Sequence, residues 1–370
     1  MTGYVVTVVV VGAFAAIALV PPTRPRSLSL VGYLLGMVVN EVPHLAAGLA
    51  LTTSTVLAVA HGHLGTAPGS WLALAGAAAV AWMLAVLVLR GVRAPDAVAS
   101  GLRDGGFDAP STPRGWALRT ALTPIPWCPR GVVRTRNLRY GEHRRHRADV
   151  YHRPDGPPGA PVLLYLHGGG YHSGSHHHEG LALLHRLADR GWVCVSATYR
   201  LRPEVGFEEH LADARAALAW ARRHAAGLGA DPDAVVMVGS SAGAHLTSLC
   251  ALEEGTALRA AIGMYGYYGR YYGRGADEAV PSTPFALSAG TAPPLLLAHG
   301  DRDTVASVEG TRRLVAHVRR ESSQPVAEIV LPGGQHGFDL VRSWRYAAVI
   351  AGIEAFLADP RVGLLSSRRA

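Results

Sequence analysis

Three residues with the chemistry of a nucleophilic catalyst occur in a fixed order along the chain: Ser241, then Asp303, then His336. Ser241 is central in the string Gly239–Gly243, whose outer glycines permit a tight turn between a strand and a helix. A histidine in a glycine-rich loop can accept the proton of a serine hydroxyl, and an acid can fix its tautomer. The set predicts acyl transfer from an ester to water through an acyl-serine.

A second glycine-rich string, HGGG at 167–170, follows the apolar run 161–166. Consecutive glycines let backbone N–H groups turn toward one point, where they stabilise the negative charge that develops on an ester carbonyl oxygen. We expect this oxyanion hole to consist of the N–H groups of Gly169, Gly170 and Ala242. The histidine that opens the string is expected to brace the loop.

Two of the assignments involve a choice between neighbours. Ser240 lacks the symmetric glycines that flank Ser241, so Ser241 is the predicted nucleophile. Asp301 and Asp303 share one turn, and either carboxylate is able to orient His336.

Strand-like and helix-like runs alternate after residue 130 and would position these groups. The strand-like runs are 131–140, 147–152, 161–167, 192–199, 234–240, 260–266, 294–299 and 326–331. The helix-like runs are 179–190, 208–227, 242–254, 307–320 and 343–357. This pattern predicts an α/β domain over 131–358 with an eight-stranded, mostly parallel sheet, flanking helices and a leading antiparallel hairpin.

Residues 1–92 form a separate, nearly uncharged region that we expect to be helical and transmembrane. Tyr4–Val20 and Trp71–Leu89 are each near the length that crosses a bilayer core of roughly 30 Å. Leu28–Ala60 is interrupted by polar residues, and we predict one span, mostly Pro43–Ala60, with an amphipathic or re-entrant lead-in. Two short spans remain an alternative.

The distribution of arginine favours three spans. The chain has a net charge of +8 and contains no lysine. Arg24 and Arg26 follow the first span, and residues 91–150 hold eleven Arg against five Asp or Glu. Three spans put both basic stretches on the cytoplasmic side, with the N-terminus outside and the catalytic domain inside. The later stretch is either a patch for anionic headgroups or a solvated linker, and no nucleic-acid-binding motif accompanies it.

The remaining segments receive simpler predictions. Residues 93–130, rich in Gly, Pro and Ala, are expected to be a linker with one helical stretch near Ala97–Leu102 that is able to fold over the active site, and 359–370 a tail. The three cysteines are too scattered for a disulfide framework. His172 and His176–His178 are a poor metal set because adjacent residues cannot all face one ion, so we expect neither a metal nor another cofactor.

From residue 131 to 357 the chain resembles the α/β-hydrolase carboxylesterases related to hormone-sensitive lipase. The matching strings are Tyr165–Ser175 (similar to HGGGW-x-x-GS), Tyr199–Glu204 (YRL-x-PE), Asp213, Gly239–Leu246 (G-x-SAG-x-x-L), His299–Asp303 (HG-x-x-D) and Gly334–Phe338 (G-x-HGF). The resemblance selects Asp303 as the acid and implies a serine esterase or lipase without a cofactor. The N-terminal hydropathy and the string Asn40–His44 are similar to membrane-anchored actinobacterial members.

Two departures from the family pattern leave the substrate open. The family often has Asp before the nucleophile, where this chain has Ser240, and the 62 residues from Ser241 to Asp303 leave little room for a cap. The predicted substrate is a small-molecule or lipid ester. The alternatives are an acyltransferase that uses the same triad and a catalytically silent membrane scaffold.

Overall fold

The computed structural model describes residues 1–64, 69–275 and 277–365, without the side chains of Arg26 and Ala46. Its sheet has eight strands in the order β1-β2-β4-β3-β5-β6-β7-β8. The strands are β1 (Val133–Arg139), β2 (Arg147–His152), β3 (Ala160–Leu166), β4 (Val193–Ala197), β5 (Ala230–Ser240), β6 (Ala260–Met264), β7 (Leu295–Gly300) and β8 (Val326–Leu331). All eight predicted strands are confirmed.

The sheet is parallel from β4 through β8 and antiparallel at its leading edge. β1 pairs with β2 and β2 with β4 in antiparallel fashion, so the predicted hairpin is present. In the parallel part, Leu166 of β3 aligns with Gly239 of β5, and Gly239 in turn aligns with Gly263 of β6. This register brings the ends of β3 and β5, where the two glycine-rich strings begin, to the same edge of the sheet.

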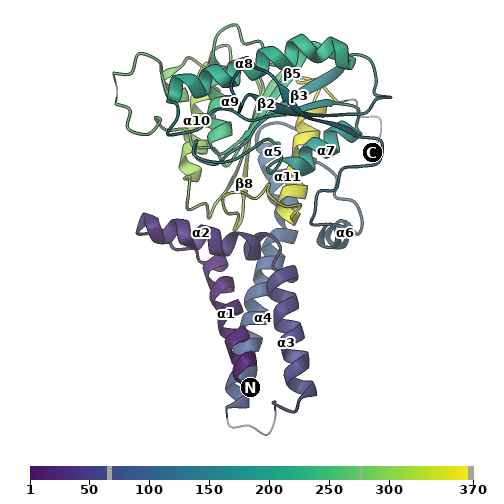
Figure 1. Ribbon diagram of the computed structural model, residues 1–370, viewed down its shortest axis with the longest axis vertical. Coiled ribbons are helices and arrows are strands. Elements are labelled where there is room, and N and C mark those ends of the chain that lie inside the picture. Colours follow the sequence, from purple (N-terminus) through teal and green to yellow (C-terminus); the bar gives the residue numbers. More distant parts are fainter. Residues whose placement is uncertain (65–68, 276, 366–370) are drawn as a thin grey trace.

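Helices cover both faces of the sheet and bury a core on each (Figure 1). One face is covered by α8 (Phe207–Ala225), α9 (Ala242–Leu252) and α10 (Val308–Glu321). The other is covered by α5 (Ala94–Asp104), α7 (Leu181–Asp189) and α11 (Trp344–Ala358). The five helices predicted after residue 130 are therefore confirmed, in the layered arrangement of an α/β hydrolase.

The N-terminal helices form a stalk below this domain (Figure 1). α1 (Thr2–Leu19), α3 (Leu49–Ala60) and α4 (Ser70–Val92) run side by side, and α2 (Arg26–Glu41) crosses the end of the stalk that meets the domain. Two stretches of the described chain are long and apolar enough to cross a membrane, namely α1 and Ser70–Asp104. The third predicted span is shorter, because α3 has 12 residues and is extended only by a π-helical turn.

The segment 93–130, predicted to be a linker, holds two helices. The side chains of Val98 and Leu102 on α5 are fully buried against the sheet, and a Cβ on Gly101 would lie 2.1 Å from the backbone oxygen of Glu328 on β8. α6 (Trp116–Leu122) lies beside the start of α11, where the indole of Trp344 donates a hydrogen bond to the Ala117 oxygen at 2.8 Å. α5 is thus part of the hydrolase core.

The part of the predicted tail that the structure describes, residues 359–365, packs against the hydrolase domain. Val362 is 1% exposed, and its oxygen accepts a hydrogen bond from Arg259 at 3.2 Å. Residues 366–370 lie outside the described residues.

Candidate active site

Ser241 occupies a strained turn between β5 and α9. Its backbone has φ 52° and ψ −115°, in the left-handed region that L-residues rarely adopt. The turn requires glycine on both sides, because a Cβ on Gly239 would lie 2.3 Å from the Gly243 carbonyl carbon and one on Gly243 would lie 2.1 Å from the Leu166 oxygen. Backbone strain at a serine between a strand and a helix is the geometry of a nucleophile elbow.

The three residues predicted to act together are brought together. His336 Nε2 lies 2.9 Å from Ser241 Oγ, and His336 Nδ1 lies 2.7 Å from Asp303 Oδ2. Both distances are within hydrogen-bond reach, so the imidazole joins the hydroxyl to the carboxylate. The alternative acid, Asp301, instead accepts a hydrogen bond from the backbone N–H of Gly333 at 2.7 Å.

The carboxylate of Asp303 is held as an anion by groups on all its sides. Oδ1 accepts the backbone N–H groups of Val305 and Ala306, each at 2.8 Å, and Oδ2 also lies 3.1 Å from Nε2 of His299. Burial alone would raise the pKa of Asp303, but the charge of His336 and hydrogen bonds from both histidines hold it well below its usual range. The side chain is fully buried, so the acid orients His336 without competition from water.

His299 is a contact that the sequence did not assign, although it opens the HG-x-x-D string. Its Nδ1 accepts from the Thr311 hydroxyl at 2.7 Å, which leaves the proton on Nε2, facing Asp303 and the Ala306 oxygen. A second histidine therefore fixes the carboxylate from behind.

The HGGG loop turns beside the serine. Gly169 and Gly170 have φ of 97° and 58°, and within the described residues neither N–H group donates to a protein acceptor. Ala242 is the first residue of α9, where N–H groups have no partner inside the helix. The loop stays in place because the buried His167 bonds the Gly168 oxygen at 2.7 Å and the Thr198 hydroxyl at 2.8 Å.

Burial lowers the pKa of His167 to about 3, so this imidazole is neutral near pH 7. It also stacks on Tyr199, with ring centroids 4.4 Å apart. These contacts agree with a bracing role.

A buried carboxylate that the sequence did not single out, Asp339, lies behind the elbow. Its Oδ2 accepts hydrogen bonds from the hydroxyls of Ser240 and Tyr165, both at 2.7 Å, and its Oδ1 accepts from Tyr265. Tyr265 also packs edge-on against the His336 ring, with centroids 4.6 Å apart. Asp339, which follows β8 in the chain, thus places a carboxylate beside Ser240, the residue before the predicted nucleophile.

Glu179 is a third acid near the site. Its Oε2 accepts the N–H of Gly168 at 2.5 Å. Burial and the neighbouring charge of Asp339 raise the pKa of Glu179, and burial raises the pKa of Asp339. In the sequence, Glu179 directly follows the histidine run. The only signal that it lies near the site is that it comes shortly after the HGGG string.

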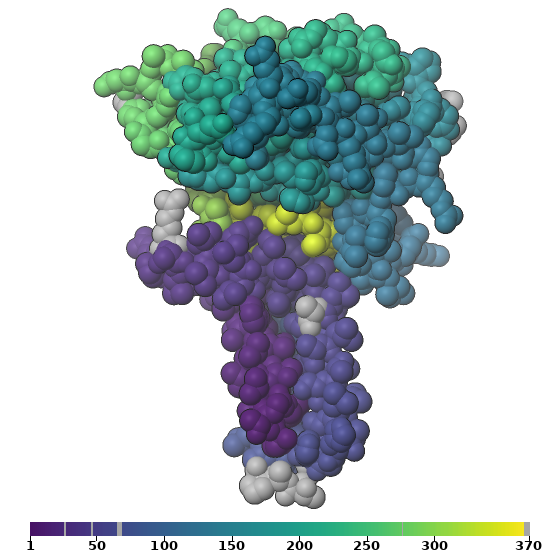
Figure 2. Space-filling model, viewed as in Figure 1, coloured from purple at the N-terminus to yellow at the C-terminus, as the bar shows by residue number. Residues whose placement is uncertain are grey.

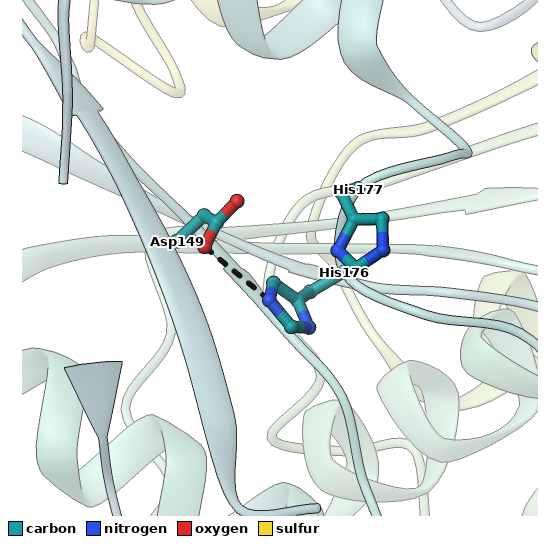
Figure 3. A group of neighbouring side chains, drawn as sticks. All are labelled: Asp149, His176 and His177. Atoms are coloured by element: carbon teal, nitrogen blue, oxygen red, sulfur yellow. Dashed lines mark ion pairs between the residues drawn. The ribbon is translucent and has the colours of Figure 1, made fainter. Parts of the chain in front are cut away.

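The histidine run forms an ion-pair cluster rather than an obvious metal centre. Ligand atoms of Asp149, His176 and His177 lie within 4.8 Å of one another (Figure 3). Asp149 also accepts hydrogen bonds from Arg134 at 2.5 and 2.8 Å and from the Asn137 N–H at 2.8 Å. A guanidinium at this distance repels a cation, so the donor set does not suit one.

Other residues singled out in the sequence have structural surroundings. Asp213 accepts a two-pronged hydrogen bond from Arg200, with contacts from 2.7 to 3.1 Å. Among the tyrosines between 265 and 272, Tyr265, Tyr268 and Tyr271 are buried, whereas Tyr267 and Tyr272 are about 40% exposed.

Comparison with known proteins finds ester hydrolases among the relatives of this chain. The chain is 32% identical over 416 aligned residues to the probable carboxylic ester hydrolase LipM of Mycobacterium tuberculosis, covering 95% of this chain and 92% of LipM. It is 32% identical to the esterase LipC of the same organism, covering 74% of each protein. The LipM alignment necessarily includes most of the N-terminal helices.

A family model and a solved structure match the hydrolase part. The BD-FAE model matches residues 148–272. The esterase Est2 of Thermogutta terrifontis has the same fold, with a TM-score of 0.56 at 23% identity over 65% of this chain and 96% of Est2. The chain belongs to the carboxylic ester hydrolases of the hormone-sensitive-lipase-like family.

Proposed function

We propose that the protein is a membrane-anchored serine esterase in which Ser241, His336 and Asp303 are the catalytic triad. The observation that supports this most directly is the continuous pair of hydrogen bonds from Ser241 through His336 to Asp303, at 2.9 and 2.7 Å. Asp303 keeps the Nδ1 proton of His336 in place, so Nε2 is free to accept the proton of the serine hydroxyl.

The first half of the reaction makes an acyl-enzyme. Ser241 Oγ bonds to the ester carbonyl carbon, its proton passes to His336 Nε2, and the carbonyl electron pair moves onto oxygen. Gly169, Gly170 and Ala242 donate their N–H groups to that oxygen, and one such donor is typically worth about 3 kcal/mol. The intermediate collapses, the ester C–O bond breaks, and the departing alcohol takes the proton from His336.

The second half releases the acid. His336 accepts a proton from water, the hydroxide oxygen bonds to the acyl carbon, and Ser241 Oγ leaves with the proton that His336 returns. No cofactor takes part in either half.

We propose that the N-terminal helices anchor this enzyme in the cell membrane with its hydrolase domain in the cytoplasm. The apolar stretches α1 and Ser70–Asp104 support the anchor. Arg24 follows the end of α1, and Arg90 and Arg93 lie at the end of α4; both ends meet the domain, as expected for the cytoplasmic side. Cys128, the exposed one of the three thiols, tests the orientation: a membrane-impermeant maleimide is expected to label it in lysed cells only, and labelling in intact cells would reverse the topology.

The catalytic proposal is tested with p-nitrophenyl esters of increasing acyl length and with a fluorophosphonate probe. Detergent-purified protein is expected to hydrolyse these esters and to be labelled at Ser241, and Ser241→Ala to lose both properties. Full activity in Ser241→Ala would contradict the triad. Labelling without hydrolysis, with ester formation on added alcohols, would instead identify an acyltransferase.

A further inference from the structure

Helix α2 forms a wall beside the catalytic histidine. The ring of Tyr33 lies edge-on to the ring of His336, with centroids 5.7 Å apart and planes at 84°. A Cβ on Gly337 would lie 2.8 Å from the Tyr33 hydroxyl and 3.4 Å from the sulfur of Met37. The helix thus packs directly on the loop that contains the proposed base.

Hydrogen bonds fasten α2 to both catalytic loops. The Ser29 hydroxyl donates to the Thr304 oxygen at 2.8 Å, next to Asp303 in the sequence. At the other end of the helix, the Asn40 amide donates to the Gly333 oxygen at 3.1 Å, in the loop of His336. A helix held at both ends against these loops has a defined position at the site.

The opposite face of α2 is apolar and uncovered within the described residues. The side chains that recur there at helical spacing are Leu28, Leu30, Val31, Leu34, Leu35 and Val38, each at least 41% exposed. Leu34 in the middle is 61% exposed. We refer to these six residues as the α2 stripe. A continuous stripe of six exposed apolar side chains on a protein surface marks an interaction site.

A second apolar segment lies at the same level on the other side of the stalk. Leu118, Leu122, Ile125 and Trp127 are all more than half exposed. Figure 1 places α6 and α2 at one height, where the stalk meets the domain, and Figure 2 shows the molecule widening there. Exposed leucines on both sides of the apolar helices, with a tryptophan on one side, are typical of a membrane–water interface.

We propose that α2 lies in the lipid interface and forms the bilayer-side wall of the active-site entrance, so that the substrate is an amphipathic ester lipid taken from the membrane. The occupant of the α2 stripe is the bilayer, because α2 follows α1 directly and crosses the domain end of the apolar stalk. Arg24 and Arg93 at that end match anionic headgroups. This inference rests on the proposed function and adds its substrate class.

The arrangement has a clear physical benefit for such a substrate. A long acyl chain that left the bilayer for a water-facing site would lose about 0.8 kcal/mol for each CH₂ exposed. A chain that slides along α2, between Tyr33 and the lipid, stays in apolar surroundings until its ester reaches Ser241. The anchor then sets the distance between the reacting serine and the headgroup layer.

The test compares a soluble and a membrane-borne ester with the same protein sample. Full-length protein is reconstituted into vesicles of phosphatidylcholine and phosphatidylglycerol, and p-nitrophenyl acetate or a long-chain diacylglycerol is supplied. Leu34→Asp puts a charge in the α2 stripe, and Ala226→Asp puts the same charge on an exposed residue after α8, on the far side of the domain. Leu34→Asp is expected to reduce diacylglycerol hydrolysis about tenfold, with p-nitrophenyl acetate hydrolysis unchanged, and Ala226→Asp to change neither.

The possible failures are distinguishable. Equal loss of both activities in Leu34→Asp, or no loss of either, would overturn the inference while leaving the esterase intact. A change from oligomer to monomer in Leu34→Asp, with diacylglycerol hydrolysis retained, would overturn it in favour of a contact between subunits. If the unmodified protein shows neither fluorophosphonate labelling nor hydrolysis of p-nitrophenyl acetate, the proposed function itself is overturned.

A depth measurement does not depend on activity. A nitroxide on Leu34→Cys, in a Cys128→Ser background, is expected to be more accessible to oxygen than to a water-soluble nickel chelate. The reverse order would place the α2 stripe in water and overturn the inference.

Discussion

Asp303 and Asp339 are two buried aspartates near the Ser241 turn, and their surroundings differ in kind. Asp303 faces two imidazoles and two backbone N–H groups, and its pKa lies below the usual range. Asp339 receives three hydroxyl groups and has Glu179 nearby, and its pKa is raised. The surroundings thus lower the pKa of one aspartate and raise the pKa of the other.

In the proposed mechanism, the contrast separates a carboxylate that serves the reaction from one that holds the scaffold. A negative charge on Asp303 stabilises the imidazolium that forms when His336 takes the serine proton. Asp339 needs only acceptor oxygens, because its task is to fix Ser240, Tyr165 and Tyr265 around the elbow. One isosteric change, Asp to Asn, therefore has a different consequence at each position.

The largest effect is expected from Asp303→Asn. The amide has no charge to stabilise the imidazolium and favours the wrong histidine tautomer, so kcat is expected to fall about 10⁴-fold. Steady-state hydrolysis of p-nitrophenyl esters measures this loss. The matched control is Asp301→Asn, whose side chain contacts the Gly333 backbone and not His336. A loss of similar size in the control would mean that the wrong acid has been assigned.

A smaller effect, mainly on stability, is expected from Asp339→Asn. One of its oxygens becomes an NH₂ group, which cannot accept the hydroxyl protons now directed at it, and an unsatisfied buried group costs about 1–3 kcal/mol. The free energy of unfolding, from denaturant titration in detergent, is the measurement. If Asp339→Asn instead lowers kcat as far as Asp303→Asn at unchanged stability, Asp339 belongs to the reaction and the contrast fails.

The sheet and the three central residues were predictable because each leaves a local signal. Buried parallel strands appear as short apolar runs, and the glycines around Ser241 are required by a turn that no other residue fits. The choice between Asp301 and Asp303 could not come from spacing, since both lie in one turn, and it needed the family resemblance.

Asp339 and α2 could not be predicted in the same way because their partners are distant in the sequence. Asp339 contacts Ser240 across 99 residues, and Ser29 contacts Thr304 across 275. The polarity of α2 was visible as an amphipathic lead-in, but nothing local indicates which loops its inner face meets. Residues 93–130 were expected to be a linker because Gly and Pro are frequent there, although the fully buried Val98 makes α5 part of the core.

The smallest effect, and the most specific to the contrast, is expected from Glu179→Gln. Burial and the charge of Asp339 raise the folded-state pKa of Glu179 above its unfolded value of about 4.3. As pH rises from that value toward the raised pKa, the unfolded chain loses its proton while the folded protein keeps it, so stability falls. Gln has no proton to lose and retains an oxygen for the Gly168 N–H. Between pH 5 and pH 8 the variant is therefore expected to gain stability on the unmodified protein, by about 1.4 kcal/mol for each unit by which the folded-state pKa is raised within this range. Denaturant titrations at both pH values measure the gain, and Glu254→Gln, at an exposed carboxylate, is the control. If Glu179→Gln instead loses stability relative to the unmodified protein as pH rises, Glu179 is stabilised as an anion. The acids beside the elbow would then behave like Asp303.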